Sequence, residues 1–130
     1  MLWDLMHILF VGVANDAAGS AMFLLCSMKY WGDVATDIQL QRAHKEFSHW
    51  CSKHGLPCCM EAFDTNNLGF GSKSYPELTT KAANVKVVIY WLNDVLWYAA
   101  IVGNDDIKRA SALLHALAAW MQIMSMGGLI

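Results

Sequence analysis

The chain has 130 residues and a formal net charge of −2, and 56% of its residues are hydrophobic against 15% that are charged. Six Trp, five Phe and four Tyr argue against a disordered chain, because disordered chains lack large apolar side chains to bury. The few Lys and Arg residues are scattered, which argues against an autonomous DNA-binding module, since such a module needs a basic face against the phosphates.

The apolar content exceeds the usual balance of about one half apolar and one quarter charged residues. This surplus predicts either helices that are buried on several sides or an apolar patch that awaits another surface. That surface would be a protein partner, a membrane or the remainder of a larger domain. We expect residues 1 to 130 to form a single helical domain or a fragment of one.

The opening segment combines a polar pair, Asp4 and His7, with a dense apolar run that follows it. Residues three apart lie on one face of a helix. Because Asp is a favoured N-cap residue, we expect a helix that starts at Asp4, with its carboxylate accepting a hydrogen bond from the backbone N–H of His7.

The same residues carry a family resemblance. Asp4-x-Met6-His7, followed by Gly12-Val13, resembles the C/D-x-x-H signature of eukaryotic cut-and-paste DNA transposases, most closely the CACTA-related group and proteins derived from it. The resemblance covers about the first 20 residues. It implies a parent protein that cleaves and rejoins DNA with metal ions held by carboxylates of an RNase H-like domain, in which Asp4 and His7 support the fold rather than bind the metal.

Three residues precede Asp4, too few for the strands that carry the first two family carboxylates. We therefore expect a non-catalytic fragment that reaches DNA only through its parent, because a two-metal site needs several converging carboxylates. A small helical protein–protein interaction module is the alternative hypothesis. A membrane protein anchored by residues 110 to 130 is the third.

The cysteines follow no spacing of a secreted disulfide scaffold, and no cleavable signal peptide is recognisable. We therefore expect an intracellular, reducing compartment, and the nucleus if the chain derives from a transposase.

Two further helices are predicted before residue 55. The first follows Val13, with Asn15 or Asp16 as its cap. The second runs from about residue 33 to residue 54, where apolar side chains recur at helical spacing and polar ones take the other side. Gly55 and Pro57 should end it.

Residues 56 to 79 are rich in turn-forming residues and predict an irregular loop. A long helix should follow from about residue 81 to residue 102, capped by Thr79 or Thr80, and its almost continuous apolar run predicts the centre of the core. Another helix should begin after Asn104, with Asp105 and Asp106 in its first turn. The fold class expected is all-α, with four to five helices in an irregular bundle.

Residues 110 to 130 contain no formal charge and are long enough to cross a bilayer. Two features argue against a membrane span. Ser111, His115 and Gln122 belong to one narrow polar stripe, and no Lys or Arg follows Arg109 to anchor the far side.

Cys51, His54, Cys58 and Cys59 are the weak candidates for a metal site, because Zn²⁺ takes four such ligands in a tetrahedron. Adjacent cysteines rarely both reach one metal, and the short C-x-x-C arms of zinc modules are absent. We expect these side chains to be structural, and we expect no cofactor. Catalytic candidates are limited to the signature residues Asp4 and His7.

Overall fold

The computed structural model describes residues 2–56, 62–64, 68, 82–102 and 105–126, and the side chains of residues 2–11, 82–84, 102 and 124–126 lie outside this description. All regular structure in the described part is helical. The helices are α1 (Leu2–Ser27), α2 (Thr36–Lys53), α3 (Ala82–Val102) and α4 (Asp105–Met126). The predicted all-α fold class is confirmed, with four helices in the described part of the chain.

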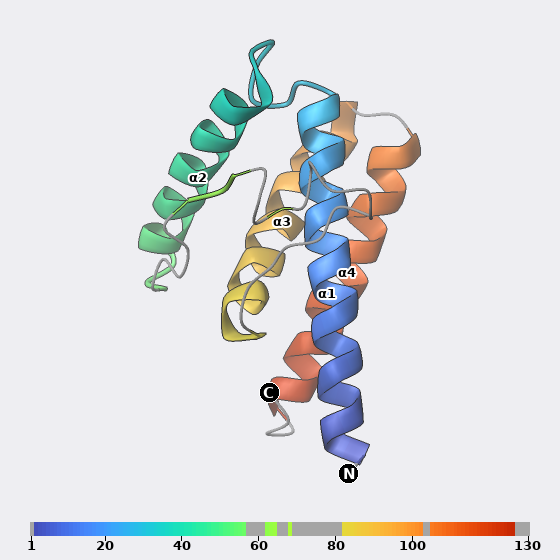
Figure 1. Cartoon of the computed structure of the whole chain (residues 1–130). Coiled ribbons are helices and arrows are strands. Elements are labelled where there is room, and N and C mark those ends of the chain that lie inside the picture. The colour runs from blue at the N-terminus through green and yellow to red at the C-terminus, as the bar shows by residue number, and fades with distance from the viewer. Residues whose placement is uncertain (1, 57–61, 65–67, 69–81, 103–104, 127–130) are drawn as a thin grey trace.

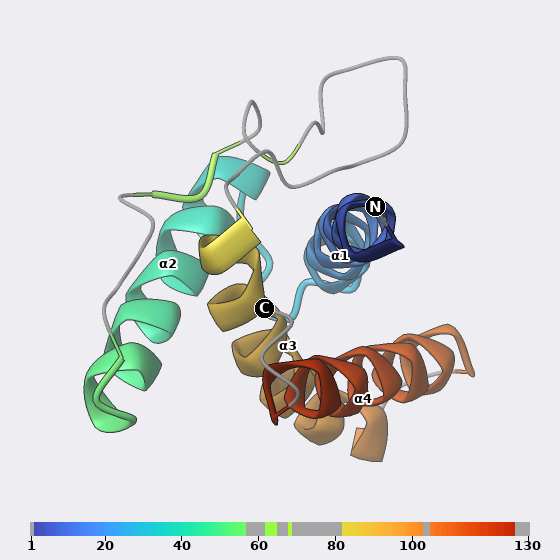
Figure 2. The ribbon, with the colours of Figure 1, turned by 90° about the horizontal axis from the view of Figure 1, so that it is seen from below.

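The helices form a bundle in which α1, α3 and α4 pack together and α2 lies against another side of α3 (Figures 1 and 2). α3 and α4 follow each other in sequence, run in opposite directions and make the most extensive helix pair. α1 crosses both of them, whereas α2 makes smaller interfaces with α1 and α3. α3 is therefore the central element, as its apolar sequence predicts.

The first two predicted helices are a single helix, so the predicted break before Asn15 is wrong. α1 runs without interruption from Leu2 to Ser27, and Asn15 is buried in its interior instead of capping a helix. Helix propensity is a weak preference that tertiary packing overrides. Here a run of small buried side chains brings α1 close to its neighbours; it consists of Ala14, Ala17, Ala18 and Ala21.

The helix start predicted at Asp4 is also wrong. α1 already begins at Leu2, which places Asp4 inside the first turn rather than at the N-cap. An acidic residue in a first turn still faces the positive end of the helix dipole. The predicted cap fails because a cap preference marks only one of several positions at which the chain can enter the helix.

The C-terminal ends of α1 and α2 each contain a residue in the left-handed region. Lys29 has φ 61°, and after it the N–H of Tyr30 donates to Leu25 O, which closes α1 in a Schellman motif. Gly55 has φ 67°, and the N–H of Leu56 donates to Cys51 O, which closes α2 in the same way. The predicted end of α2 at Gly55 is confirmed, and Pro57 lies outside the described residues.

The other boundaries agree closely with the sequence. α2 covers Thr36–Lys53 within the predicted span, and α3 covers Ala82–Val102. α4 carries Asp105 and Asp106 in its first turn, as expected. Thr79, Thr80, Asn104 and most of the predicted loop lie outside the described residues.

The core is built from the facing sides of all four helices. Each fully buried large apolar side chain contributes roughly 1.5–3 kcal/mol relative to an exposed one. The largest of these side chains are Met22, Leu25, Leu40, Phe47, Leu68, Ile89, Trp91, Leu92, Leu96 and Ile107. Within the described residues, no helix is both long and apolar enough to span a membrane.

Candidate functional site

The signature residues Asp4 and His7 both lie in the first two turns of α1. Their side chains are outside the described part, so the predicted orientation of His7 toward the protein stays a prediction. In Figure 1 this end of α1 lies far from α2. The signature therefore belongs to a different part of the bundle from Cys51 and His54.

The cysteine and histidine cluster divides between two environments. The Cys51 side chain is buried on the inner face of α2, whereas His54 is exposed just after the helix ends. The His54 ring lies over Trp50 at a centroid distance of 4.3 Å, and His54 Nδ1 is 2.9 Å from Trp50 O. Cys58 and Cys59 lie outside the described residues. Among the residues that are described, no group of three potential metal ligands comes together.

Polar side chains fasten α2 to the segment that precedes it. Gln39 Nε2 donates to Cys26 O at 3.1 Å and to Val34 O at 3.4 Å. Arg42 Nη1 donates to Trp31 O at 2.8 Å, and Trp31 Nε1 in turn donates to Glu46 Oε2 at 3.0 Å. The buried Gln39 and the exposed Arg42 and Glu46 thus link α2 to the end of α1 and to the segment between the two helices.

An aromatic cluster centred on Trp91 joins α2 to α3. The Trp91 ring stacks on Phe63 at 5.7 Å and on Trp31 at 6.3 Å, and Phe47 lies tilted against it at 5.2 Å. Such pairs contribute about 0.5–1.5 kcal/mol beyond their buried area. Above this cluster, Trp50 Nε1 donates to Asp94 Oδ2 at 2.9 Å, which is a second direct link between α2 and α3.

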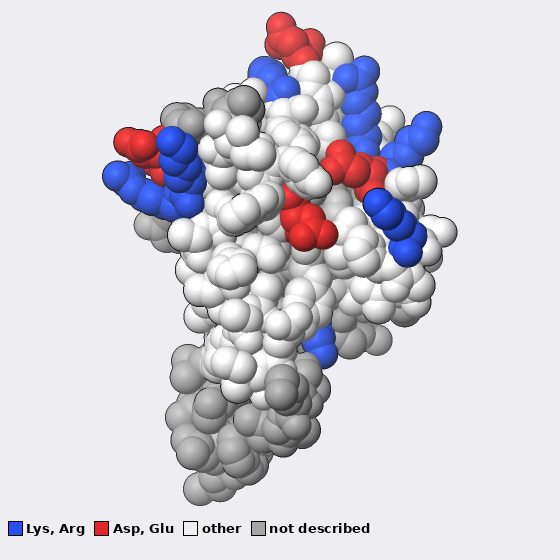
Figure 3. All heavy atoms as spheres, turned by 180° about the vertical axis from the view of Figure 1, so that it is seen from behind, with Lys and Arg blue, Asp and Glu red and all other residues white. Residues whose placement is uncertain are grey.

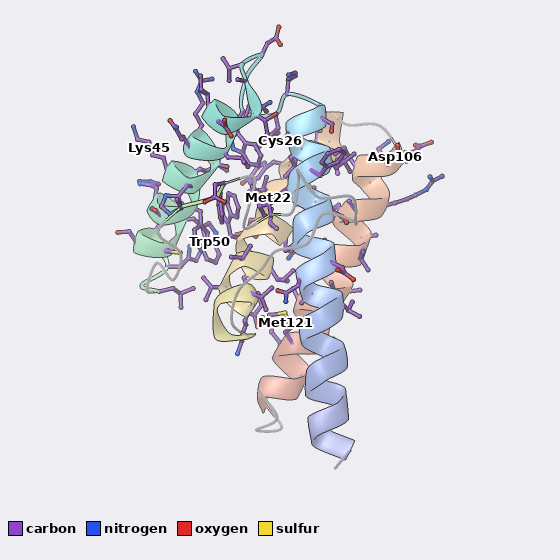
Figure 4. The ribbon with its side chains drawn as sticks, viewed as in Figure 1. Met22, Cys26, Lys45, Trp50, Asp106 and Met121 are labelled. Atoms are coloured by element: carbon purple, nitrogen blue, oxygen red, sulfur yellow. The ribbon has the colours of Figure 1, made fainter. Side chains whose placement is uncertain are left out.

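A hollow of about 420 Å³ lies over this link, between α2 and α3. We call it the aromatic groove, because five aromatic side chains line it: Tyr30, Trp50, Trp91, Trp97 and Tyr98. The carboxylates of Glu46 and Asp94 also line it. Figure 4 shows Trp50 extending from α2 toward α3 at this position.

A second hollow of about 560 Å³ adjoins the aromatic groove and extends to α4. Trp50, His54 and Asp94 line both hollows, so the hydrogen bond between Trp50 and Asp94 lies at their common border. His115 and Gln122 of α4 line the second hollow. The polar stripe predicted along the last helix therefore partly faces this hollow.

The outer side of α3 and α4 is unusually apolar. Trp97 and Ile101 of α3 are 64% and 71% exposed, and Ile123 of α4 is 67% exposed. Trp97 and Ile101 share a shallow hollow with Ala112 of α4. We call this surface the α3–α4 apolar face. It consists of Trp97, Ile101 and Ala112, beside Lys108, and of Ala116, Ala119 and Ile123, which continue from Ala112 along one side of α4 at helical spacing. Figure 3 shows the molecule from behind, with most charged side chains toward the top and the two sides, an acidic group near the middle, and uncharged surface between them.

Three groups have a raised pKa: the buried Cys26 and the half-buried Tyr30 and Tyr90, the last through burial alone. Burial raises the pKa of the Cys26 thiol to about 11, although the charge of Lys29 acts in the opposite direction. Burial, and then the nearby Glu46 carboxylate, raises the pKa of Tyr30. Cys26 is therefore a protonated, weakly nucleophilic thiol at neutral pH. This chemistry is typical of a structural cysteine.

Sequence reasoning missed the residues that shape these surfaces. Asp94, Trp97 and Tyr98 follow one another at i, i+3 and i+4 and so share one side of α3. A charge inside an otherwise apolar helix, with aromatic residues at those spacings, is a signal that could have marked this groove. The contribution of Trp50 could not be read from the pattern, because it depends on where α2 packs.

Neither a protein-family model nor a curated protein nor a solved structure matches this chain. The transposase resemblance of the first residues stays a prediction. Function must therefore be inferred from the chemistry of the surfaces described above.

Proposed function

We propose that this chain is a non-catalytic helical module that associates with another protein surface through the α3–α4 apolar face. The single observation that carries the proposal is the exposure of Trp97 and Ile101 on α3 and of Ile123 on α4, with Lys108 as the one charged side chain in the hollow that Trp97 and Ile101 line. Scattered exposed apolar residues are ordinary, but a contiguous apolar patch is typical of an interaction site.

The composition of this face fits a protein interface. The cores of protein interfaces are depleted in charged residues and enriched in aromatic ones. The energetically dominant positions are commonly Trp and Tyr. Trp97 and Tyr98 are exposed neighbours on α3, and α4 carries no charged residue after Arg109. Each Å² of apolar surface that a partner removes from water stabilises the complex by about 25 cal/mol.

The partner proposed first is the remainder of a transposase-like protein, as the resemblance of the opening segment implies. In that case DNA is reached through the parent, and the compartment is the nucleus. A separate protein partner is the alternative.

The proposal is tested on the whole chain with the triple variant Trp97→Ser, Ile101→Ser and Ile123→Ser. We expect the wild-type chain to bind a fluorescent apolar probe and to self-associate as its concentration rises, because the face is uncovered. The triple variant should lose most of both properties while its helix content stays unchanged. Ile38→Ser, on the exposed side of α2, is the matched control and should change neither.

A photo-reactive residue provides a direct test of a partner. Placed at position 101 or 123, it should give a cross-linked product of the same discrete mass in the cell that makes the protein, and position 45 on α2 should not. Equal cross-linking at all three positions contradicts the proposal. So does DNA strand cleavage by the isolated chain with Mg²⁺ or Mn²⁺ that is lost in both Asp4→Ala and His7→Ala.

A further inference from the structure

We propose that the aromatic groove between α2 and α3 binds an alkylated ammonium group. This site goes beyond the association proposed above and does not depend on it. A cation is attracted to the face of an aromatic ring, and most strongly to that of Trp. Four of the five aromatic side chains of the groove are at least partly exposed, namely Tyr30, Trp50, Trp97 and Tyr98, whereas Trp91 is buried and stacks on Phe63 and Trp31. The groove combines these four rings with two carboxylates in a volume of about 420 Å³, which lies within the range of small-molecule sites.

The carboxylates are held beside the rings by hydrogen bonds from indole groups. Asp94 Oδ2 accepts from Trp50 Nε1 at 2.9 Å, and Glu46 Oε2 accepts from Trp31 Nε1 at 3.0 Å. Each indole uses one of the two oxygens of its carboxylate, and the negative charge remains beside the groove. An indole that donates to a carboxylate also becomes richer in π electrons, which strengthens its attraction for a cation.

The other charged group in the lining is Lys53, and the remaining titratable side chains there are His49, His54, Tyr30 and Tyr98. Among the Asp, Glu and Lys side chains of the lining, two carboxylates stand against one ammonium, which gives a net negative formal charge. Lys53 is exposed near the end of α2, and its long side chain can keep the ammonium in water. This balance favours a cation over an anion.

An alkylated ammonium fits the lining better than a bare one. A bare ammonium carries three N–H donors that need acceptors, whereas the Glu46 and Asp94 carboxylates each already accept an indole N–H and five of the other lining side chains are aromatic. A trimethylammonium group carries the same charge without those donors, and its methyl groups pack against ring faces. Quaternary ammonium groups are therefore the chemistry that this lining recognises. A choline molecule and a trimethyl-lysine side chain both supply it.

The experiment uses the whole chain with its Trp indole nitrogens labelled for NMR. It is titrated with choline and with 3,3-dimethylbutan-1-ol, in which carbon replaces the charged nitrogen. Choline should shift the Trp50 indole signal and bind roughly 3- to 30-fold more tightly than the neutral isostere, which corresponds to a cation–π contribution. A short peptide with trimethyl-lysine, compared with the same peptide carrying unmodified lysine, distinguishes a protein-borne ligand from a small molecule.

Two charge variants sharpen the test. Asp94→Asn keeps the size and the acceptor but removes the charge, so choline should bind about 5-fold more weakly while binding of the isostere is unchanged. Lys53→Met should strengthen choline binding. Asp106→Asn, on α4, is the matched control and should have no effect. Equal binding of choline and its isostere overturns the proposal, and so does the absence of any shift with both choline and the trimethyl-lysine peptide.

Discussion

The two outer helices, α2 and α4, both pack on α3 but differ in how they are attached and in what they expose. α2 is fastened by side-chain hydrogen bonds from Gln39, Arg42 and Trp50. α4 packs on α3 and α1 through buried apolar side chains such as Leu114 and Met121. Outward, α2 presents charges, whereas α4 presents alanines and Ile123 beyond its first turns.

This difference indicates that the outer faces of the two helices are suited to different surroundings. The outer face of α2 is suited to water, because its charged and polar side chains remain hydrated. The outer face of α4 gains free energy if another surface covers it. The same bundle therefore has one outer surface that is stable in contact with water and another that favours association.

The largest effects should come from the inner faces, where the two helices ought to behave alike. Phe47→Ala on α2 should lower the free energy of unfolding by about 3–5 kcal/mol, and Leu114→Ala on α4 by about 2–5 kcal/mol, because both side chains are fully buried. Urea unfolding measures both. Ile38→Ala, at an exposed position of α2, should stay within about 0.5 kcal/mol. A loss below about 1 kcal/mol at Leu114 would mean that α4 is not a packed part of the core.

The polar attachment of α2 can be broken with Gln39→Glu. Gln39 is fully buried, and its Nε2 donates to two backbone carbonyls. A carboxylate there faces acceptors without a donor, so the free energy of unfolding should fall by on the order of 3 kcal/mol at neutral pH.

The pH dependence of this variant follows from the same burial. The folded-state pKa of the new carboxyl should lie above its unfolded value of about 4.3. The variant is therefore most stable below about pH 4.3, and it loses stability as the pH rises through the folded-state pKa. Urea midpoints at pH 4 and pH 7 measure this. A variant equally stable at both would show that α2 is not held by these bonds.

Two glycines with positive φ can be tested, Gly32 in the connection between α1 and α2 and Gly55 after the end of α2. Gly32 has φ 113°, and a Cβ there would meet the Arg42 guanidinium, which donates to Trp31 O. Gly32→Ala should therefore cost about 1–3 kcal/mol. Gly55→Ala, at φ 67° with open space around it, should cost about 1 kcal/mol.

A third glycine supplies a control, because its replacement by alanine should raise the stability instead of lowering it. Gly12 lies inside α1, and an added Cβ meets nothing within 4 Å. Gly12→Ala should therefore stabilise the chain by up to about 1 kcal/mol. Thermal unfolding of the three alanine variants gives the order of their stabilities. A destabilised Gly12→Ala would argue against the continuous α1.

The smallest effect concerns Cys26, which lies at the same junction. Its pKa is raised to about 11 from a reference value of 9.0, so the folded state favours the neutral thiol. The resulting stability is present below pH 9.0 and is lost as the pH rises toward about 11. Alkylation by iodoacetamide at pH 8, followed by mass spectrometry, should modify Cys26 about 100-fold more slowly than an unfolded thiol. Rapid modification would show that the junction opens.

The sequence was sufficient for the parts of the fold that depend on local pattern. The regular spacing of Leu40, Phe47 and Cys51 predicted α2, and the glycine at position 55 marked its end. The nearly continuous apolar run of α3 predicted its central place. These features are local because helical periodicity and left-handed backbone angles are properties of a few adjacent residues.

The continuous α1, the groove around Trp50 and Asp94, and the apolar face of α3 and α4 were decided by the tertiary structure. Asn15 has the chemistry of a helix cap, but packing of the small residues around it keeps it inside one long helix. Trp91 and Trp97 are equally apolar in sequence, yet Trp91 is buried and Trp97 exposed. Composition records a surplus of apolar residues, whereas the arrangement of neighbouring helices determines which of them remain in contact with water.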